Sequence, residues 1–166
     1  MNIYNITDSF GKNAASRIAA AKEPGINGAL ACIESFYYAF NNRDIKVFSQ
    51  VWHNHSQIQL NNPLGGIIFG KSSITRLYEK IFTGPAEVWV TFSHIVVFET
   101  PKMITFAGQE NGAFHKAEKE LSLKIRTTRI VSYHEEAQQW GMVHHHGSID
   151  DPHLLAQYQA AVNNIS

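Results

Sequence analysis

The second half of the chain decides the fold, and its clearest stretch is residues 118–148, EKELSLKIRTTRIVSYHEEAQQWGMVHHHGS. In residues 118–131 apolar and polar side chains alternate, which is the pattern of a strand with one buried face. Residues 138–148 have the same period, and the polar segment 134–137 predicts a turn between them. Strands joined by a short turn pair in antiparallel fashion, so the stretch predicts two neighbouring strands of an antiparallel sheet.

The same alternation predicts earlier strands of this sheet and a small hairpin before them. The strands comprise residues 87–99 and 102–109, and the hairpin comprises residues 56–60 and 67–69. Thr100 with Pro101, and Asn111 with Gly112, predict the turns that separate the long strands. Together with the two last strands, these segments form an antiparallel meander that is long enough to twist and curl.

Helical periodicity replaces the alternation in the first half of the chain. Apolar residues at spacings of three and four predict a helix at about 27–41 and a short second helix capped by Asp44. A third helix is expected to start at Ser72 or Ser73 and to stop at Gly84. Helices segregated from an antiparallel sheet make an α+β domain, in which the curled sheet closes a pocket against the first helix.

The length of 166 residues suits one domain with an extension at each end. We assign residues 25–149 to that domain. Residues 1–24 form an N-terminal extension, in which Asp8 is expected to cap a short alanine-rich helix. Residues 150–166 form a C-terminal helix, because Pro152 is favoured at a first helical position.

The composition excludes several classes of partner. Acidic and basic residues balance at 14 each, so no strong field gathers nucleic acid or an anionic membrane. Cys32 is the single cysteine and lies within an apolar helical pattern, which predicts a packed thiol and no disulfide. The first residues lack the pattern of a signal peptide, and no apolar run is long enough for a membrane span. We therefore expect a cytoplasmic protein.

Residues 65–72, GGIIFGKS, satisfy the phosphate-loop pattern G-x-x-x-x-G-K-[ST]. A phosphate loop follows a buried strand of a parallel sheet, whereas here a polar turn precedes it and a β-forming IIF run fills its centre. We therefore interpret Gly65 and Gly66 as the turn of the hairpin and Gly70 as the entry to the third helix.

The three adjacent histidines near the end of the chain do not share one face. Strict alternation places His144 and His146 on the face of Trp140 and Met142, and His145 on the opposite face. Two imidazoles are too few for a zinc site, and the sequence identifies no third ligand. We therefore predict neither a metal nor another cofactor.

Arg129 continues the apolar face of its strand, after Ile125 and Thr127. A buried guanidinium must be paired within the protein or be open to a ligand. The pattern leaves both interpretations open. Arg129 either forms a structural ion pair, with Glu110 as a possible partner, or holds a carboxylate ligand through two parallel hydrogen bonds.

Four stretches of the chain resemble one family, in the same order. They are ESFYYAFNNRDIKVFSQVW (34–52), LGGIIFG (64–70), TTRIV (127–131) and QQWGMVHHHGS (138–148). They resemble the nuclear transport factor 2-like, or SnoaL-like, superfamily. The strongest likeness is to the association (hub) domain of calcium/calmodulin-dependent protein kinase II and its free-standing bacterial relatives.

The resemblance implies a cone-shaped α+β fold, with three N-terminal helices packed on a strongly curved, mostly antiparallel sheet. It also implies homodimers, or larger rings, formed through that sheet. Arg129 matches an arginine that points into the hub pocket, and His94 lies where the family often has a pocket histidine. Gly147 stands where the hub has a second pocket arginine, so the resemblance implies weaker binding of anions here.

Three functions are compatible with these residues. The first is a homo-oligomer that binds a small organic molecule, with a carboxylate as the expected ligand group of Arg129. Its other candidate binding residues are His94, His145, Tyr38 and Trp52. The second is an isomerase or dehydratase with His94, His145 or Glu110 as general base. The third is an assembly module whose cavity is filled by side chains.

Overall fold

The predicted meander forms the centre of a curved, open sheet of seven strands in the computed structural model, which describes residues 1–163. The strands are β1 (Asn2–Ile6), β2 (Gln59–Asn61), β3 (Ile67–Phe69), β4 (Glu87–Glu99), β5 (Met103–Lys116), β6 (Lys119–His134) and β7 (Gln139–Ser148). Their spatial order is β1-β4-β5-β6-β7-β2-β3. Every neighbouring pair is antiparallel except β2 with β7, which makes the sheet mixed.

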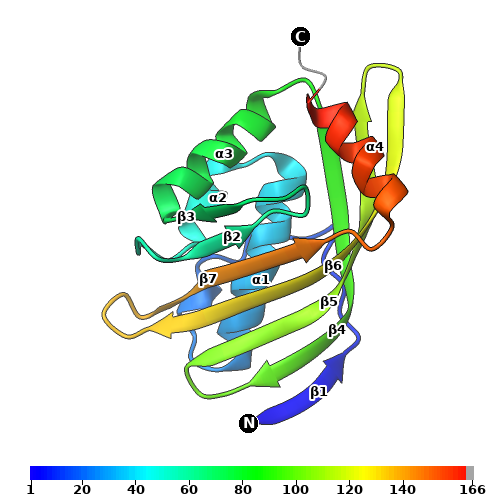
Figure 1. The fold of residues 1–166 in the computed structure, drawn as a ribbon. Helices are drawn as coiled ribbons and strands as arrows, with labels where there is room; N and C mark the ends of the chain where they lie inside the picture. Colours follow the sequence, from blue (N-terminus) through cyan, green and yellow to red (C-terminus); the bar gives the residue numbers. More distant parts are fainter. Residues whose placement is uncertain (164–166) are drawn as a thin grey trace.

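The helices occupy the inner side of this curved sheet, and α1 passes behind β6 and β7 in Figure 1. They are α1 (Ile26–Asn42), α2 (Ile45–Gln50), α3 (Lys71–Thr83) and α4 (Pro152–Asn163). Asp44 caps α2 as predicted, because its carboxylate accepts the backbone N–H groups of Lys46 and Val47 at 3.0 Å each. The arrangement confirms the cone-shaped α+β fold. No helix within residues 1–163 has the length and apolar character that a membrane crossing requires.

One row of residues across the sheet defines its inner face. The strand register aligns Val97, Phe106, Arg129, His145 and Leu60, one from each of five adjacent strands. All five are almost fully buried beneath the helices. Arg129 and His145 are thus direct neighbours on β6 and β7, in the middle of an otherwise apolar row.

The turn predicted at Asn111 and Gly112 is wrong. Strand β5 continues through both residues, and the reversal occurs after Lys116, where Ala117 has a φ of 52°. Gly112 is needed for close packing and not for a turn, because a Cβ there would lie 1.9 Å from the carbonyl oxygen of Trp89. The long β5–β6 ladder outweighs the local preference of the Asn-Gly pair for a turn.

The helix expected after Asp8 in the N-terminal extension is also wrong. Strand β1 pairs with β4 along the edge of the sheet, and the alanine-rich segment forms only a 3₁₀ turn at Ala20–Lys22. This segment offers few large apolar groups that could hold a helix against the core, so its intrinsic propensity does not decide its structure. The first residues of the extension therefore add an edge strand to the sheet.

The glycines of the phosphate-loop pattern have the roles predicted for them. Gly65 and Gly66 form the turn of the β2–β3 hairpin with φ values of 110° and 86°. Gly70, with a φ of 78°, is the residue before α3, so this helix begins ahead of Ser72 and Ser73. The expected C-terminal helix is present as α4, and residues 164–166 of that segment lie outside the described part of the chain.

Candidate functional site

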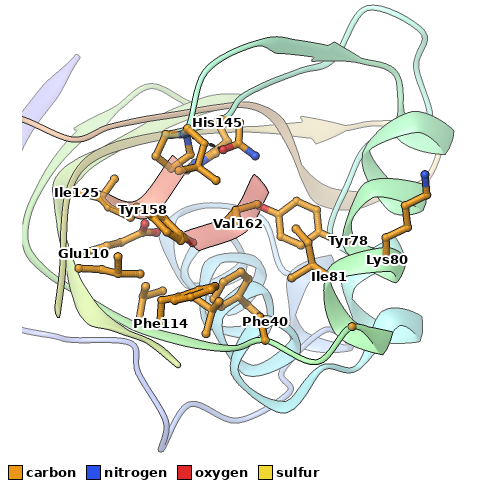
Figure 2. A pocket seen from close by; sticks show the side chains of 18 of the residues that line it. Phe40, Tyr78, Lys80, Ile81, Glu110, Phe114, Ile125, His145, Tyr158 and Val162 are labelled. Atoms are coloured by element: carbon orange, nitrogen blue, oxygen red, sulfur yellow. Dashed lines mark hydrogen bonds between the residues drawn. The ribbon is translucent and has the colours of Figure 1, made fainter. Parts of the chain in front are cut away.

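A cavity of about 240 Å³ lies between the helices and the inner face of the sheet. Most of its wall is apolar, and α4 supplies Tyr158 and Val162 to it (Figure 2). The apolar wall comprises Phe36, Phe40, Tyr78, Ile81, Val88, Val90, Phe114, Leu123 and Ile125, among others. Buried polar side chains reach it from the sheet, namely Glu110, Arg129 and His145.

Arg129 forms a buried ion pair with Glu110. Its Nη2 donates to Glu110 Oε1 at 2.8 Å, and its Nε donates to the hydroxyl of Tyr37 at 2.8 Å. That hydroxyl in turn donates to Glu110 Oε1 at 2.6 Å, which closes a three-membered network. Of the two interpretations that the sequence left open, the structure has the ion pair.

Aromatic rings and a thioether complete the surroundings of the guanidinium. Its central carbon lies 3.7 Å from the ring centroid of Phe36 and 4.8 Å from that of Tyr37. Its Nη1 points to the sulfur of Met142 at 3.7 Å. The positive charge of Arg129 is therefore balanced by one carboxylate and stabilised by two ring faces in a region without bulk water.

His145 is the polar group of the cavity whose hydrogen bonding is incomplete. The residue is 2% exposed, and its Nδ1 has no partner within residues 1–163. Burial, followed by the positive charge of Arg129, holds the pKa of this imidazole well below its usual value of 6.5. His145 is therefore a neutral imidazole at physiological pH, with one ring nitrogen available to a ligand.

The faces predicted for the residues of the last strand are wrong, because β7 contains a bulge. Val143 lies between the pairs Ile130–His144 and Val131–Met142 and has no partner of its own on β6. The extra residue reverses the alternation, so Trp140 and Met142 share the inner face with His145. His144 and His146 are on the outer face, without Trp140 and Met142, and their ring centroids are 6.5 Å apart. Within residues 1–163 no three potential ligands gather as a metal site would need.

Three of the predicted binding residues lie outside the cavity. His94 is exposed at a bulge of β4, with a φ of 55° and its Nδ1 at 3.2 Å from the hydroxyl of Ser93. Trp52 is buried against Phe48 and forms a bridge to Met142, so it is a core residue. Tyr38 is half-buried on α1, on the side away from the cavity wall. Of the expected set, Arg129, His145 and Glu110 line the cavity.

Two contributions to the site were missed by the sequence analysis. Tyr37 falls within the apolar spacing that predicted the helix at about 27–41, but its hydroxyl connects Arg129 to Glu110. Tyr158 comes from α4, where burial and then the charge of Glu110 raise its pKa to about 12, so the phenol stays protonated. The sequence predicted the last helix from Pro152, but not that this helix would contribute to the cavity wall.

Cys32 is buried on α1, as its position in the apolar pattern predicted. Its thiol lies 3.7 Å from the carbonyl oxygen of Val51, and burial raises its pKa to about 12. The thiol stays protonated at neutral pH and has no part in the chemistry of the cavity.

Solved structures with the same architecture come from several bacteria. A protein assigned as a calcium/calmodulin-dependent protein kinase type II association domain from Thiobacillus denitrificans superposes with a TM-score of 0.59 at 20% identity, over 74% of this chain and 94% of that one. A protein assigned as a dehydratase of the nuclear transport factor 2-like family, from Streptomyces avermitilis, gives 0.63 at 16% identity, over 72% and 91%. A protein with a cystatin-like fold from Caulobacter vibrioides gives 0.61 at 15% identity, over 81% and 94%.

These identities are low, so the structural likeness establishes the fold alone. Among curated protein sequences none matches the chain. A family model, described as the SnoaL-like domain, matches residues 29–152, which span most of α1, the whole meander and the connection to α4. The chain therefore belongs to the SnoaL-like family, whose fold is that of the nuclear transport factor 2-like superfamily.

Proposed function

We propose that this protein binds a small, largely apolar organic molecule in the cavity between its helices and its sheet. The observation that carries the proposal is the cavity itself, which combines an apolar wall with the buried polar groups of Arg129, Glu110 and His145. A few placed polar groups in an apolar hollow are the usual composition of a ligand site. A cavity kept only for assembly would gain stability by being filled with side chains.

The volume limits the size of the ligand. Sites for drug-sized molecules occupy roughly 300–1,000 Å³, whereas a cavity of about 150 Å³ admits benzene. At about 240 Å³, the cavity here fits one ring with a short polar substituent. Benzyl alcohol, benzamide and acetophenone are therefore suitable probes.

Filling the cavity should abolish binding of these probes. Ile81 contributes to the wall from α3, so Ile81→Trp places an indole in the space that a ligand would occupy. We expect the variant to bind the probes at least about tenfold more weakly than the wild type, as measured by ligand-observed NMR. Glu79→Trp is the matched control, because Glu79 is an exposed residue of the same helix. Equal binding by wild type and Ile81→Trp would show that the ligands bind elsewhere.

A catalytic role in the same cavity is the second candidate, favoured by the neutral imidazole of His145 and the carboxylate of Glu110, which both line the cavity. Isomerases and dehydratases need a base that removes a proton from carbon in an apolar setting. Acetophenone incubated with the protein in D₂O tests this, since such a base exchanges its α-protons for deuterium. Exchange that is lost in His145→Gln supports an enzyme, whereas exchange at the rate of buffer alone leaves a binding protein.

We also propose that the protein associates with itself through the outer face of the sheet. One register row on that face joins Ile3, Phe98, Thr105, Ile130, His144, Gln59 and Phe69 across all seven strands. Ile3 and Phe69, at its two ends, are 57% and 48% exposed. A broad face with exposed apolar groups is typical of an interface.

A charge at the centre of this face should disrupt the association. Ile130→Glu places a carboxylate in the middle of the row, and we expect it to yield monomers where the wild type forms dimers or larger rings. Light scattering after size-exclusion chromatography measures the difference. Ser73→Glu adds the same charge at an exposed position of α3, away from the outer face of the sheet, and should leave the wild-type mass unchanged. A monomeric wild type would refute the proposed interface.

A further inference from the structure

Each of the three guanidinium nitrogens of Arg129, which is buried in the cavity wall, already has a partner. Arg129 Nε donates to Tyr37, Nη2 donates to Glu110, and Nη1 points to the sulfur of Met142. Phe36 covers one face of the guanidinium at 3.7 Å. A ligand carboxylate at Arg129 would lie beside Glu110, which is itself 4% exposed and accepts two hydrogen bonds.

The remaining groups do not supply a free positive charge at this end of the cavity. His145 is neutral, because burial and Arg129 hold its pKa well below 6.5. Lys80 contributes to the cavity wall from α3 but is exposed to solvent, and Figure 2 shows it on the opposite side of the cavity from Glu110. Lys116 is near the end of β5 and has a partner of its own. A second carboxylate beside Glu110 would therefore meet repulsion in a low-dielectric region.

We infer that Glu110, as the counter-ion of Arg129, makes the cavity selective for neutral ligands and excludes small carboxylates. The inference rests on the proposed ligand-binding function and names the class of ligand. It replaces the carboxylate ligand that the sequence pattern of Arg129 suggested. Glu110 occupies the place next to Arg129 that an anionic ligand would otherwise take.

His145 provides the attachment point for a neutral ligand. The residue lines the cavity, and its buried Nδ1 lacks a partner within residues 1–163. A neutral imidazole can accept a hydrogen bond at one ring nitrogen and donate at the other. An alcohol or a primary amide can satisfy either form, so the ligand class is a compact apolar molecule with one hydroxyl, carbonyl or amide group.

The test compares benzamide, benzyl alcohol and benzoate, which share a ring and differ in charge, by isothermal titration calorimetry at pH 7.5. Wild type should bind a neutral probe at least about tenfold more tightly than benzoate, and Glu110→Gln should reverse this order. The variant keeps the shape of the side chain but leaves Arg129 without its counter-ion. A charge-assisted hydrogen bond should then strengthen benzoate binding by about 10- to 100-fold.

Glu136→Gln is the matched control, because it removes the same charge at an exposed position outside the cavity. It should leave the order of the three probes as in wild type. Benzoate binding to wild type as tightly as the neutral probes would overturn the inference while supporting the cavity as a ligand site. If no probe binds either wild type or Glu110→Gln, the proposed function fails and the inference fails with it. Should Glu110→Gln not fold, the order measured on wild type decides alone.

Discussion

Replacing Arg129 with methionine should lower the free energy of unfolding by about 3–5 kcal/mol. Arg129 is 2% exposed and is the counter-ion of Glu110, which is 4% exposed. Without the guanidinium, the carboxylate keeps only the hydrogen bond from Tyr37 and becomes a buried, unpaired charge. Urea denaturation followed by circular dichroism measures the loss.

The double variant with Arg129→Met and Glu110→Gln separates the cost of the unpaired charge from the cost of altered packing. Because the glutamine is uncharged, about half or more of the lost stability should return. Glu110→Gln alone should be less destabilising than Arg129→Met, since the glutamine can still accept from Tyr37. A double variant no more stable than Arg129→Met would contradict an ion pair as the source of the effect, and would point to the packing of Arg129 on Phe36.

Replacing Trp140 with alanine should cost about 3–5 kcal/mol, the range for removing a large aromatic side chain from a core. The indole is fully buried, its Nε1 donates to the carbonyl oxygen of Glu23 at 3.0 Å, and its ring lies 5.5 Å from that of Tyr133. The variant loses both the packing and the bond that fastens the N-terminal segment to β7. Thermal and urea unfolding check the value.

Two further variants test whether the inner face of β7, and not its outer face, contributes this stability. Trp140→Phe should recover much of the stability, because a phenyl ring fills part of the space although it loses the bond to Glu23. His146→Ala, at an exposed position of the same strand, should change stability by less than about 0.5 kcal/mol. Strict alternation would place Trp140 and His146 on one face and predicts similar, small effects. A loss below about 1 kcal/mol in Trp140→Ala would therefore contradict the bulge at Val143.

The periodicity of apolar residues in the sequence was sufficient to predict the architecture and to place Arg129 on the buried face of its strand. Alternation over residues 121–131 has no interruption in β6, so it correctly aligned Arg129 with Leu123 and Ile125 on the buried face. In β7 the same alternation assigned the wrong faces, because the bulge at Val143 adds one residue to the strand. A bulge leaves no mark in the order of apolar and polar residues, because it is set by pairing with the neighbouring strand.

Residues of the candidate site could be predicted only where the chemistry of one side chain requires a particular partner. A buried guanidinium needs a carboxylate, which correctly suggested Glu110. His94 was assigned to the cavity by resemblance alone, and its bulge in β4 places it in solvent. The sequence could not identify Tyr37 as part of the site, because a tyrosine among the apolar residues of a helix cannot be distinguished from an ordinary core residue. Only the position of β5 and β6 beneath α1 brings its hydroxyl to the ion pair.

The pairing of β1 with β4 has a consequence during synthesis on the ribosome. Tyr4 donates from its hydroxyl to Glu99 at 2.8 Å, although the two residues are 95 positions apart in the chain. At a translation rate of about 5–20 residues per second, the first strand waits roughly 5–20 s before its partner exists. Throughout that interval Ile3 and the unpaired backbone of residues 2–6 are open to other nascent chains, so β1 is the segment for which a holding chaperone would matter most.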